Sequence, residues 1–176
     1  MKLRISEIMK KESLLVAVLT IVMLTGCTHS NNGVVKQPSH SQPFNGEVEI
    51  LQSWQGDYPV AQLNQLPEKQ REQGIGFIGD AEAFAGVWKA FKPGEPVPEI
   101  NFRDNLVLFA RNTQFFNRIS IGKVNVTNGV AQVLAMETMS AMPIEDKVAM
   151  SLVVVPRSGI TAIQTGDEIF PVNKKL

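Results

Sequence analysis

The sequence predicts an α+β fold, in which mostly antiparallel sheet packs against one main helix at about residues 80–92. Large apolar residues in this stretch recur at i, i+3, i+4 and i+7, the spacing of one helix face: Phe84, Val87, Trp88 and Phe91. The chain after it consists of short apolar runs separated by turn residues. One of these turns is Asn128-Gly129, which is typical of a two-residue type I′ hairpin between antiparallel strands.

The chain before and around the helix can be divided into four elements. Residues 47–54 alternate loosely between polar and apolar side chains, which predicts a strand. Residues 61–73 are polar and predict a helical turn or a loop, whereas residues 75–79 predict a short strand. The helix can begin after Asp80, which suits an N-terminal cap, and it ends at Pro93-Gly94.

The chain after the helix predicts strands at 106–112, 118–126, 130–138, 147–156, 160–164 and 169–172. The second of these runs changes the phase of its apolar residues across Gly122-Lys123, which predicts a β-bulge. In the third run we expect Met136 to lie on the core face. The fourth run, 147–156, is almost continuously apolar and predicts a central strand that is covered on both faces.

The first 26 residues have the parts of a secretory signal. Basic residues precede an apolar run: Lys2, Arg4, Lys10 and Lys11. The run, residues 13–25, carries no charge and is shorter than the roughly 20 residues that a membrane span takes. It ends in Leu24-Thr25-Gly26-Cys27, and Cys27 is the only cysteine in the chain.

This ending resembles the lipobox of bacterial lipoproteins, in which a Leu and two small residues precede an invariant Cys. The resemblance implies that residues 1–26 are removed, and that two acyl chains on Cys27 attach the protein to a membrane. Thr28 stands where an Asp would signal retention in the inner membrane. The resemblance therefore implies an outer-membrane lipoprotein facing the periplasm, with an inner-membrane location as the less expected alternative.

The remaining chain predicts a tether and one domain. Residues 27–45 are rich in Ser, Asn, Gln and Pro, a composition typical of a flexible tether. Residues 46–176 have the length of a single domain with its own core.

Charge and histidine content argue against several classes of function. Four of the 17 basic and two of the 17 acidic residues lie in 1–26, so 13 basic and 15 acidic residues remain, for a net charge of −2. This balance does not favour nucleic acid as a partner. Both histidines, His29 and His40, lie in the tether, so the domain lacks an imidazole for nucleophilic catalysis or a His-based zinc site. We therefore expect no enzymatic activity, no bound metal and no cofactor.

Three glycines before the helix have the spacing of a dinucleotide-binding fingerprint: Gly74, Gly76 and Gly79. That fingerprint requires a buried strand of a βαβ unit before its first glycine. Residues 67–73 are polar, so we interpret the glycines as flanking a short strand that turns into the helix.

Two clusters are candidates for a binding site. Phe115-Phe116 lies between two predicted strands, where an exposed ring can contact a partner protein and a ring folded over the sheet is the alternative. Met136, Met139 and Met142 recur at every third residue, and thioethers are ligands of Cu(I). Small-ligand or Cu(I) binding is therefore the alternative function. The other interpretation of the methionines is packing, with Met136 in the core and the others under a loop.

A carboxylate-based enzyme is the third hypothesis. It would use acidic residues such as Glu137, Glu145 and Asp146. A glycosidase, for example, needs two carboxylates across a substrate cleft. Nothing in the sequence locates such a pair, and Glu145 and Asp146 lie in a predicted loop.

The segments 77–112, 119–126 and 150–159 together resemble the C-terminal domain of the protease complex subunit family (PrcB-like). The similarity extends from about Ile75 to Val172. This chain has Asn101 where the family usually has Asp, and Phe115-Phe116-Asn117 where it has a Gly-Gly turn. The resemblance implies a non-catalytic accessory lipoprotein domain that associates with envelope proteins, including proteases. We therefore expect a membrane-anchored lipoprotein that acts through protein–protein contact at Phe115 and Phe116.

Overall fold

The structure is a computed structural model that describes residues 44–140 and 142–172. The predicted signal peptide, Cys27 and most of the predicted tether lie outside the described residues. Among the residues that the structure describes, no helix combines the length and apolar character that a membrane crossing requires.

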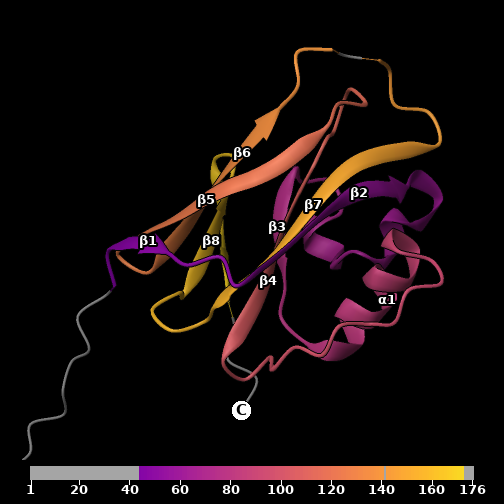
Figure 1. Ribbon diagram of the computed structural model, residues 1–176. Coiled ribbons are helices and arrows are strands. Elements are labelled where there is room, and N and C mark those ends of the chain that lie inside the picture. Colours follow the sequence, from indigo (N-terminus) through magenta and orange to yellow (C-terminus); the bar gives the residue numbers. More distant parts are fainter. Residues whose placement is uncertain (1–43, 141, 173–176) are drawn as a thin grey trace, which may run out of the picture. The chain divides into compact units, whose positions relative to one another are not determined.

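The described chain forms two sheets and one main helix (Figure 1). The five-stranded sheet has the order β1-β5-β6-β8-β9, with bounds Gly46–Val48, Ile119–Thr127, Val130–Glu137, Ala162–Thr165 and Glu168–Pro171. The four-stranded sheet has the order β2-β7-β4-β3, with bounds Gln52–Pro59, Lys147–Pro156, Asn105–Arg111 and Ile75–Ile78. The helix α1 spans Ala81–Phe91, and two short 3₁₀ helices, Val60–Gln65 and Glu68–Gln70, precede β3.

The α+β class with one main helix is confirmed, and the helix lies within the predicted range 80–92. The sheets are not all antiparallel, because β6 pairs with β8 in parallel while the other strand pairs run antiparallel. The predicted strand at 47–54 is two strands in different sheets. β1 pairs with β5 and β2 pairs with β7, so the chain changes sheet at residues 49–51.

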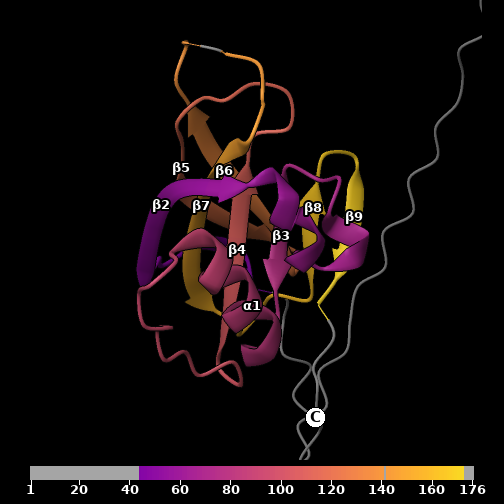
Figure 2. The same cartoon turned by 90° about the vertical axis from the view of Figure 1, so that its right-hand side faces the viewer.

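The four-stranded sheet is the middle layer of three. Figure 2 shows α1 in front of this sheet, with β5 and β6 behind it. One face of β4 and β7 packs with β5 and β6, and the other face packs with α1. In β7 the residues from 148 to 155 are all buried, which confirms the predicted central strand. A strand covered on both faces has no solvent-facing positions, and this explains why the β7 sequence is apolar throughout.

The helix is fixed at its start and along one face. The Ala83 N–H donates to Asp80 Oδ1 at 2.9 Å, so Asp80 caps the N-terminus as predicted. The predicted apolar stripe is buried. The Trp88 ring lies 5.1 Å from the Trp54 ring of β2 and 5.7 Å from the Phe84 ring, between centroids. An aromatic cluster therefore joins α1 to the edge strand β2.

The β5–β6 hairpin has the predicted turn and the predicted bulge. Asn128 and Gly129 both have positive φ angles, 52° and 81°, as a type I′ turn requires. The register shifts between Ile121 and Lys123, at Gly122. The buried Ser151 of β7 accepts the Ile121 N–H on its Oγ at 3.3 Å, so a side chain from the other sheet satisfies this donor.

The prediction that Met136 lies on the core face is wrong. Its side chain is 64% exposed, because the buried or half-buried face of β6 consists of Ala131, Val133 and Ala135. Met136 instead lies on the outer face with Leu134, and its Cε lies close to Gly122 at the bulge. The polar residue Gln132, which belongs to the same phase as Met136, indicates the outer face in the sequence.

The three glycines before α1 serve the packing of β3. The strands on either side of α1, β3 and β4, pair directly and antiparallel, so α1 is not the crossover of a parallel βαβ unit. A Cβ at Gly76 would overlap the Gln70 side chain and the Phe109 ring. Gln70 Oε1 accepts the Phe77 N–H at 2.5 Å. Because Gly76 has no side chain, it leaves space for this Gln70 group, which satisfies a backbone N–H on the edge strand β3.

The only tyrosine of the chain, Tyr58, gives a test of the helix-facing core. Its ring is fully buried, its hydroxyl donates to Gln62 O at 3.0 Å, and burial raises the pKa of Tyr58 to about 12. The unfolded chain loses this proton near pH 10, so between pH 10 and 12 the folded state binds more protons and stability falls as pH rises. We expect a loss of roughly 2–3 kcal/mol across that window.

Denaturant midpoints from pH 8 to 11.5, with absorbance at 295 nm, measure this effect. The Tyr58→Phe variant should lose about 1 kcal/mol at pH 8 with its hydrogen bond, but it should show a shallower decline above pH 10. A tyrosinate signal with a midpoint near pH 10 in the folded protein would contradict the burial of this hydroxyl.

Candidate functional site

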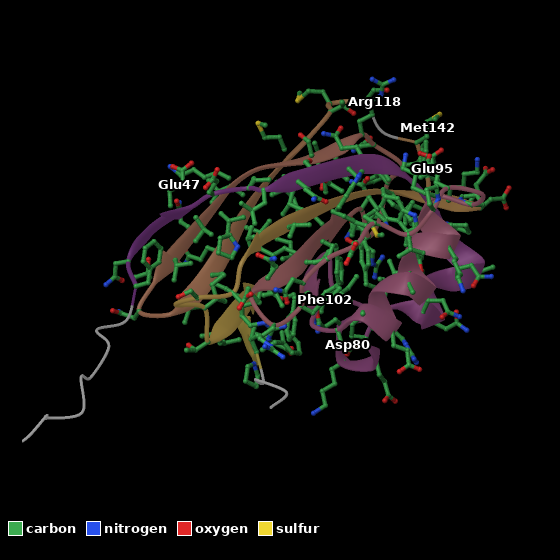
Figure 3. The ribbon with its side chains drawn as sticks, turned by 60° about the horizontal axis from the view of Figure 1, so that its bottom comes forward. Glu47, Asp80, Glu95, Phe102, Arg118 and Met142 are labelled. Atoms are coloured by element: carbon green, nitrogen blue, oxygen red, sulfur yellow. The ribbon has the colours of Figure 1, made fainter. Side chains whose placement is uncertain are left out.

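The candidate site is the end of the domain where two long loops meet. One loop, residues 112–118, joins β4 to β5, and the other, residues 138–146, joins β6 to β7. We call these two segments, without the undescribed residue 141, the loop end; both lie at the top of Figure 1. Figure 3 shows Arg118 of one loop and Met142 of the other at the same end of the molecule.

Backbone contacts join the two loops. Phe115 and Pro143 form an isolated antiparallel bridge, and the Phe116 N–H donates to Met142 O at 2.6 Å. The Thr138 N–H donates to Arg118 O at 3.1 Å, which continues the β5–β6 pairing beyond the strands. These contacts join the two loops, so the loops form one connected unit and are not two independent segments.

The two phenylalanines at the loop end have different environments. Phe115 is 48% exposed, whereas Phe116 is half-buried and packs against the core between the sheets. Consecutive residues of an extended segment point to opposite sides, which accounts for the difference. The expectation that at least one of these rings is exposed holds for Phe115, while Phe116 takes the alternative position against the sheet.

Phe116 also lines two open cavities. The first has a volume of about 350 Å³ and is otherwise lined by Met142, Pro143, Glu145, Asp146 and Lys147. The second has a volume of about 460 Å³ and is lined by residues of β2, of β5 with the residue before it, and of β7: Gln55, Gly56, Asp57, Arg118, Ile119 and Ala149. The Lys147 Nζ lies 3.9 Å from Asp57 Oδ2, an exposed ion pair at this end of the domain.

The three methionines of the candidate copper site are all exposed. Met139 is fully exposed and Met142 more than half exposed, so the interpretation that they fill gaps under a loop is wrong. Met142 lines the first cavity, whereas Met136 lies against Gly122 on the outer face of β5. Met136 and Met142 thus have different neighbours in this arrangement.

The carboxylates of the third hypothesis are solvated. Glu137, Glu145 and Asp146 are exposed. Within the described ranges, no three His, Cys, Asp or Glu side chains gather closely enough to hold a metal ion. Glu145 and Asp146 both line the first cavity, where their side chains are in contact with solvent.

The buried charges elsewhere in the domain have structural partners. The Arg111 guanidinium donates to Arg71 O and to Asn112 O at 3.1 Å, and burial lowers its pKa while Glu72 raises it. Arg157 donates to Gly79 O at 2.8 Å and to Asn105 O at 3.3 Å. Both arginines therefore donate to backbone carbonyls from parts of the chain that are distant in sequence or adjacent to them, which gives these buried guanidinium groups hydrogen-bond partners.

The sequence interpretation missed one part of the exposed apolar surface. Leu134 is nearly half exposed on the outer face of β6, beside Met136. Leu134 and Met136 share one phase of β6, so a prediction that places Met136 on the inner face places Leu134 there too. Gln132 was the available signal for the correct phase.

Comparison of the chain with family models, with curated proteins and with solved structures finds no match.

Proposed function

We propose that this chain is a lipid-anchored lipoprotein of the cell envelope whose domain is not an enzyme and binds a protein partner in the periplasm through the loop end. The observation on which the proposal rests is the group of exposed apolar side chains on the two connected loops: Phe115, Met139 and Met142. The resemblance to the PrcB-like family supports an accessory role beside envelope proteins, including proteases.

The chemistry of the loop end suits a protein partner. Covering an exposed Phe or Met side chain completely contributes about 1.5–3 kcal/mol, so a few such residues are enough for a modest interface. Methionine adapts its shape to different partners, and exposed aromatic residues are common anchors in interfaces. Charged residues of both signs line the two cavities at this end of the domain and can form the polar rim of an interface: Arg118, Glu145, Asp146 and Lys147.

The anchor in the proposal depends on Cys27. We expect Cys27→Ser to move the protein from the membrane fraction to the soluble fraction, or to leave it unprocessed, because the acyl chains have no attachment point. Cell fractionation and the mass of the mature chain measure this. Thr25→Ser, which keeps a small residue before the cysteine, should remain anchored. A Cys27→Ser protein of mature mass that still sediments with membranes would remove the anchor from the proposal.

The partner surface can be tested with matched positions. A photocrosslinking amino acid at Phe115 should capture an envelope protein in intact cells, whereas one at Leu51 should not. Leu51 is 45% exposed, close to the 48% of Phe115. Its backbone N–H donates to Val154 O, in the part of β7 that is remote from the loop end. Phe115→Ser should weaken capture from a crosslinker at Met139 by about tenfold without lowering the denaturant midpoint. Equal capture at Phe115 and Leu51 would contradict a specific surface.

Cu(I) binding is the second candidate, because the exposure of Met136 removes the packing objection to it. A Cu(I) site needs two or three sulfur atoms that converge on one point. We propose that Met139 and Met142 contact a protein. The double variant Met139→Leu with Met142→Leu should therefore retain as much Cu(I) as the unaltered protein when both compete with a chelator. A stoichiometric Cu(I) complex that the double variant loses would favour copper instead.

A further inference from the structure

The upper part of β6 has a backbone edge without a strand partner. β8 pairs with β6 only at Val130 and Ala131, and Gln132 Nε2 then donates to Gln164 Oε1 at 2.7 Å, so residues 133–137 of β6 lie beyond the paired part. Figure 1 shows the end of β6 extending past β8 toward the loop end. This edge is therefore continuous with the surface to which we assigned the proposed function.

The backbone groups on this edge can be identified from the pairing pattern. In an antiparallel pair, alternate residues direct their N–H and C=O groups to the partner strand. The Thr138 N–H donates to Arg118 O, so the backbone groups of residue 138 point toward β5. The extra residue of the bulge lies in β5, which leaves the alternation along β6 unbroken, so the backbone groups of the even-numbered residues of β6 point toward β5. Val133, Ala135 and Glu137 therefore direct their backbone groups to the open side, where only an extended backbone can pair with all of them.

Each of the other edges in the described sheets has a feature that opposes further pairing. β1 has three residues with Glu47 among them, β9 ends in Pro171, β2 has Asp57 and ends in Pro59, and β3 has its Phe77 N–H bonded to Gln70. The open part of β5 contains the bulge and Lys123. Charge, proline, bulges and short length are the devices by which sheets avoid unwanted pairing. Residues 133–136 contain no charge, proline or bulge, and the one charged residue on this edge, Glu137, lies at its end.

The side chains along the edge indicate the chemistry of its occupant. Leu134 and Met136 project on the outer face, so a strand beside them gains burial from apolar side chains at alternate positions. Glu137 is exposed at the end of the edge, and no ion pair involving it is formed among the described residues. A basic residue on the incoming strand complements it. β6 itself contains no Lys or Arg, so a second copy of β6 cannot supply that residue.

We propose that residues 133–137 of β6 accept an extended segment of the partner protein as an added strand, with alternating apolar residues and a Lys or Arg beside Glu137. This inference rests on the proposed function, since it names the kind of partner segment that the same end of the domain binds. Addition of a strand to an open sheet edge is a recurrent mode of peptide recognition, in which the main chain provides affinity and alternate side chains provide specificity.

Amide hydrogen exchange of the folded domain tests the edge. The probe is an acetylated Lys-Val-Thr-Val-Thr-Val-Thr peptide with an amidated C-terminus, in which Lys opposite Glu137 places the first two Val residues opposite Met136 and Leu134 in an antiparallel pair. Without it, the amides of Val133, Ala135 and Glu137 should exchange at least tenfold faster than those of Leu134 and Met136. With saturating peptide, exchange at the three open amides should slow at least tenfold. A peptide N-methylated at alternate residues should give no protection, and one with Glu in place of Lys should bind about threefold to tenfold more weakly.

Three variants distinguish strand addition at β6 from non-specific binding of the peptide to apolar surface and from misfolding of the domain. Ala135→Pro removes one open N–H and should abolish protection. If it does not fold, Met136→Lys provides the same test by placing a charge on the apolar face. Ile169→Lys is the matched control, since Ile169 is 60% exposed on β9 and Met136 is 64% exposed. It should leave peptide binding unchanged.

The outcomes distinguish the two proposals. Phe115→Ser should not affect protection by the peptide, so crosslinking at Phe115 reports on the proposed function and hydrogen exchange reports on the edge. Capture of a partner at Phe115 without peptide protection at β6 would overturn the strand addition alone. Protection that rises with protein concentration in the absence of peptide would show self-pairing and overturn the choice of occupant.

Discussion

Replacing Trp88 by alanine is expected to lower the free energy of unfolding by about 3–5 kcal/mol, more than we expect from any other single substitution in the domain. The indole is almost fully buried between α1 and the middle sheet. Its removal leaves a cavity and also removes ring contacts to Trp54, Phe84 and Phe91. Denaturant midpoints of the purified domain measure the loss, and Trp fluorescence then reports on Trp54 alone.

Two further variants show that packing causes this loss. Lys89→Ala changes the neighbouring exposed position of α1 and should alter stability by about 0.5 kcal/mol or less. Trp88→Phe should cost less than Trp88→Ala, because the indole Nε1 is buried without a hydrogen-bond partner and its removal costs no bond. An unchanged midpoint in Trp88→Ala would mean that this face of the helix does not pack on the sheet.

The second large effect is expected at Gly76. An added Cβ would overlap both the Gln70 side chain and the Phe109 ring, which lies in the core beneath the helix. The Gln70 amide would have to leave, and the Phe77 N–H that it accepts would lose its partner. Overpacking typically costs about 1–3 kcal/mol, and the lost hydrogen bond adds about 1 kcal/mol. We therefore expect Gly76→Ala to lower stability by roughly 2–4 kcal/mol in a denaturant titration.

Gly79→Ala is the matched control for this change. A Cβ at Gly79 would meet its nearest atoms, in Arg157 and Phe77, at 3.7 Å, which is ordinary contact. The losses in free energy of unfolding caused by Gly76→Ala and Gly79→Ala should therefore differ by at least about 1.5 kcal/mol. Equal and small losses at both positions would mean that Gln70 does not occupy the space beside Gly76.

Elements specified by local pattern were predictable from the sequence. The stripe of α1 repeats with the helical period, and Asp80 lies at its start, so both the element and its cap follow from neighbouring residues. The turn at Asn128-Gly129 requires two positive φ angles, which few dipeptides adopt readily. The bulge at Gly122 was visible because it reverses the alternation of one strand.

Elements that depend on distant partners were not predictable. Nothing local indicates that residues 47–54 divide between two sheets, because the division follows from pairing with β5 and β7. The parallel pairing of β6 with β8 depends on the path of the chain between them. Met136 was misplaced because both phases of β6 contain apolar residues, and only the packing of Ala131 and Val133 against the other sheet decides between them.

The candidate site divides in the same way. Exposure of Phe115 follows from its place in a loop between strands, so the sequence could suggest it. The bridge from Phe115 to Pro143 joins loops 28 residues apart, and the open edge of β6 depends on where β8 ends. Neither has a local signature in the sequence.

The pairing within the four-stranded middle sheet also affects the order in which parts of the domain fold. Gln52 of β2 pairs with Val154 of β7, so its partner comes 102 residues later in the chain. Bringing such distant segments together is slow, because loop-closure entropy is lost before contacts are gained. β2 cannot complete its pairing until almost all of the domain has been synthesised. The layer that both cores need therefore assembles late, and the N-terminal part of a growing chain would remain open and accessible to chaperones until β7 follows.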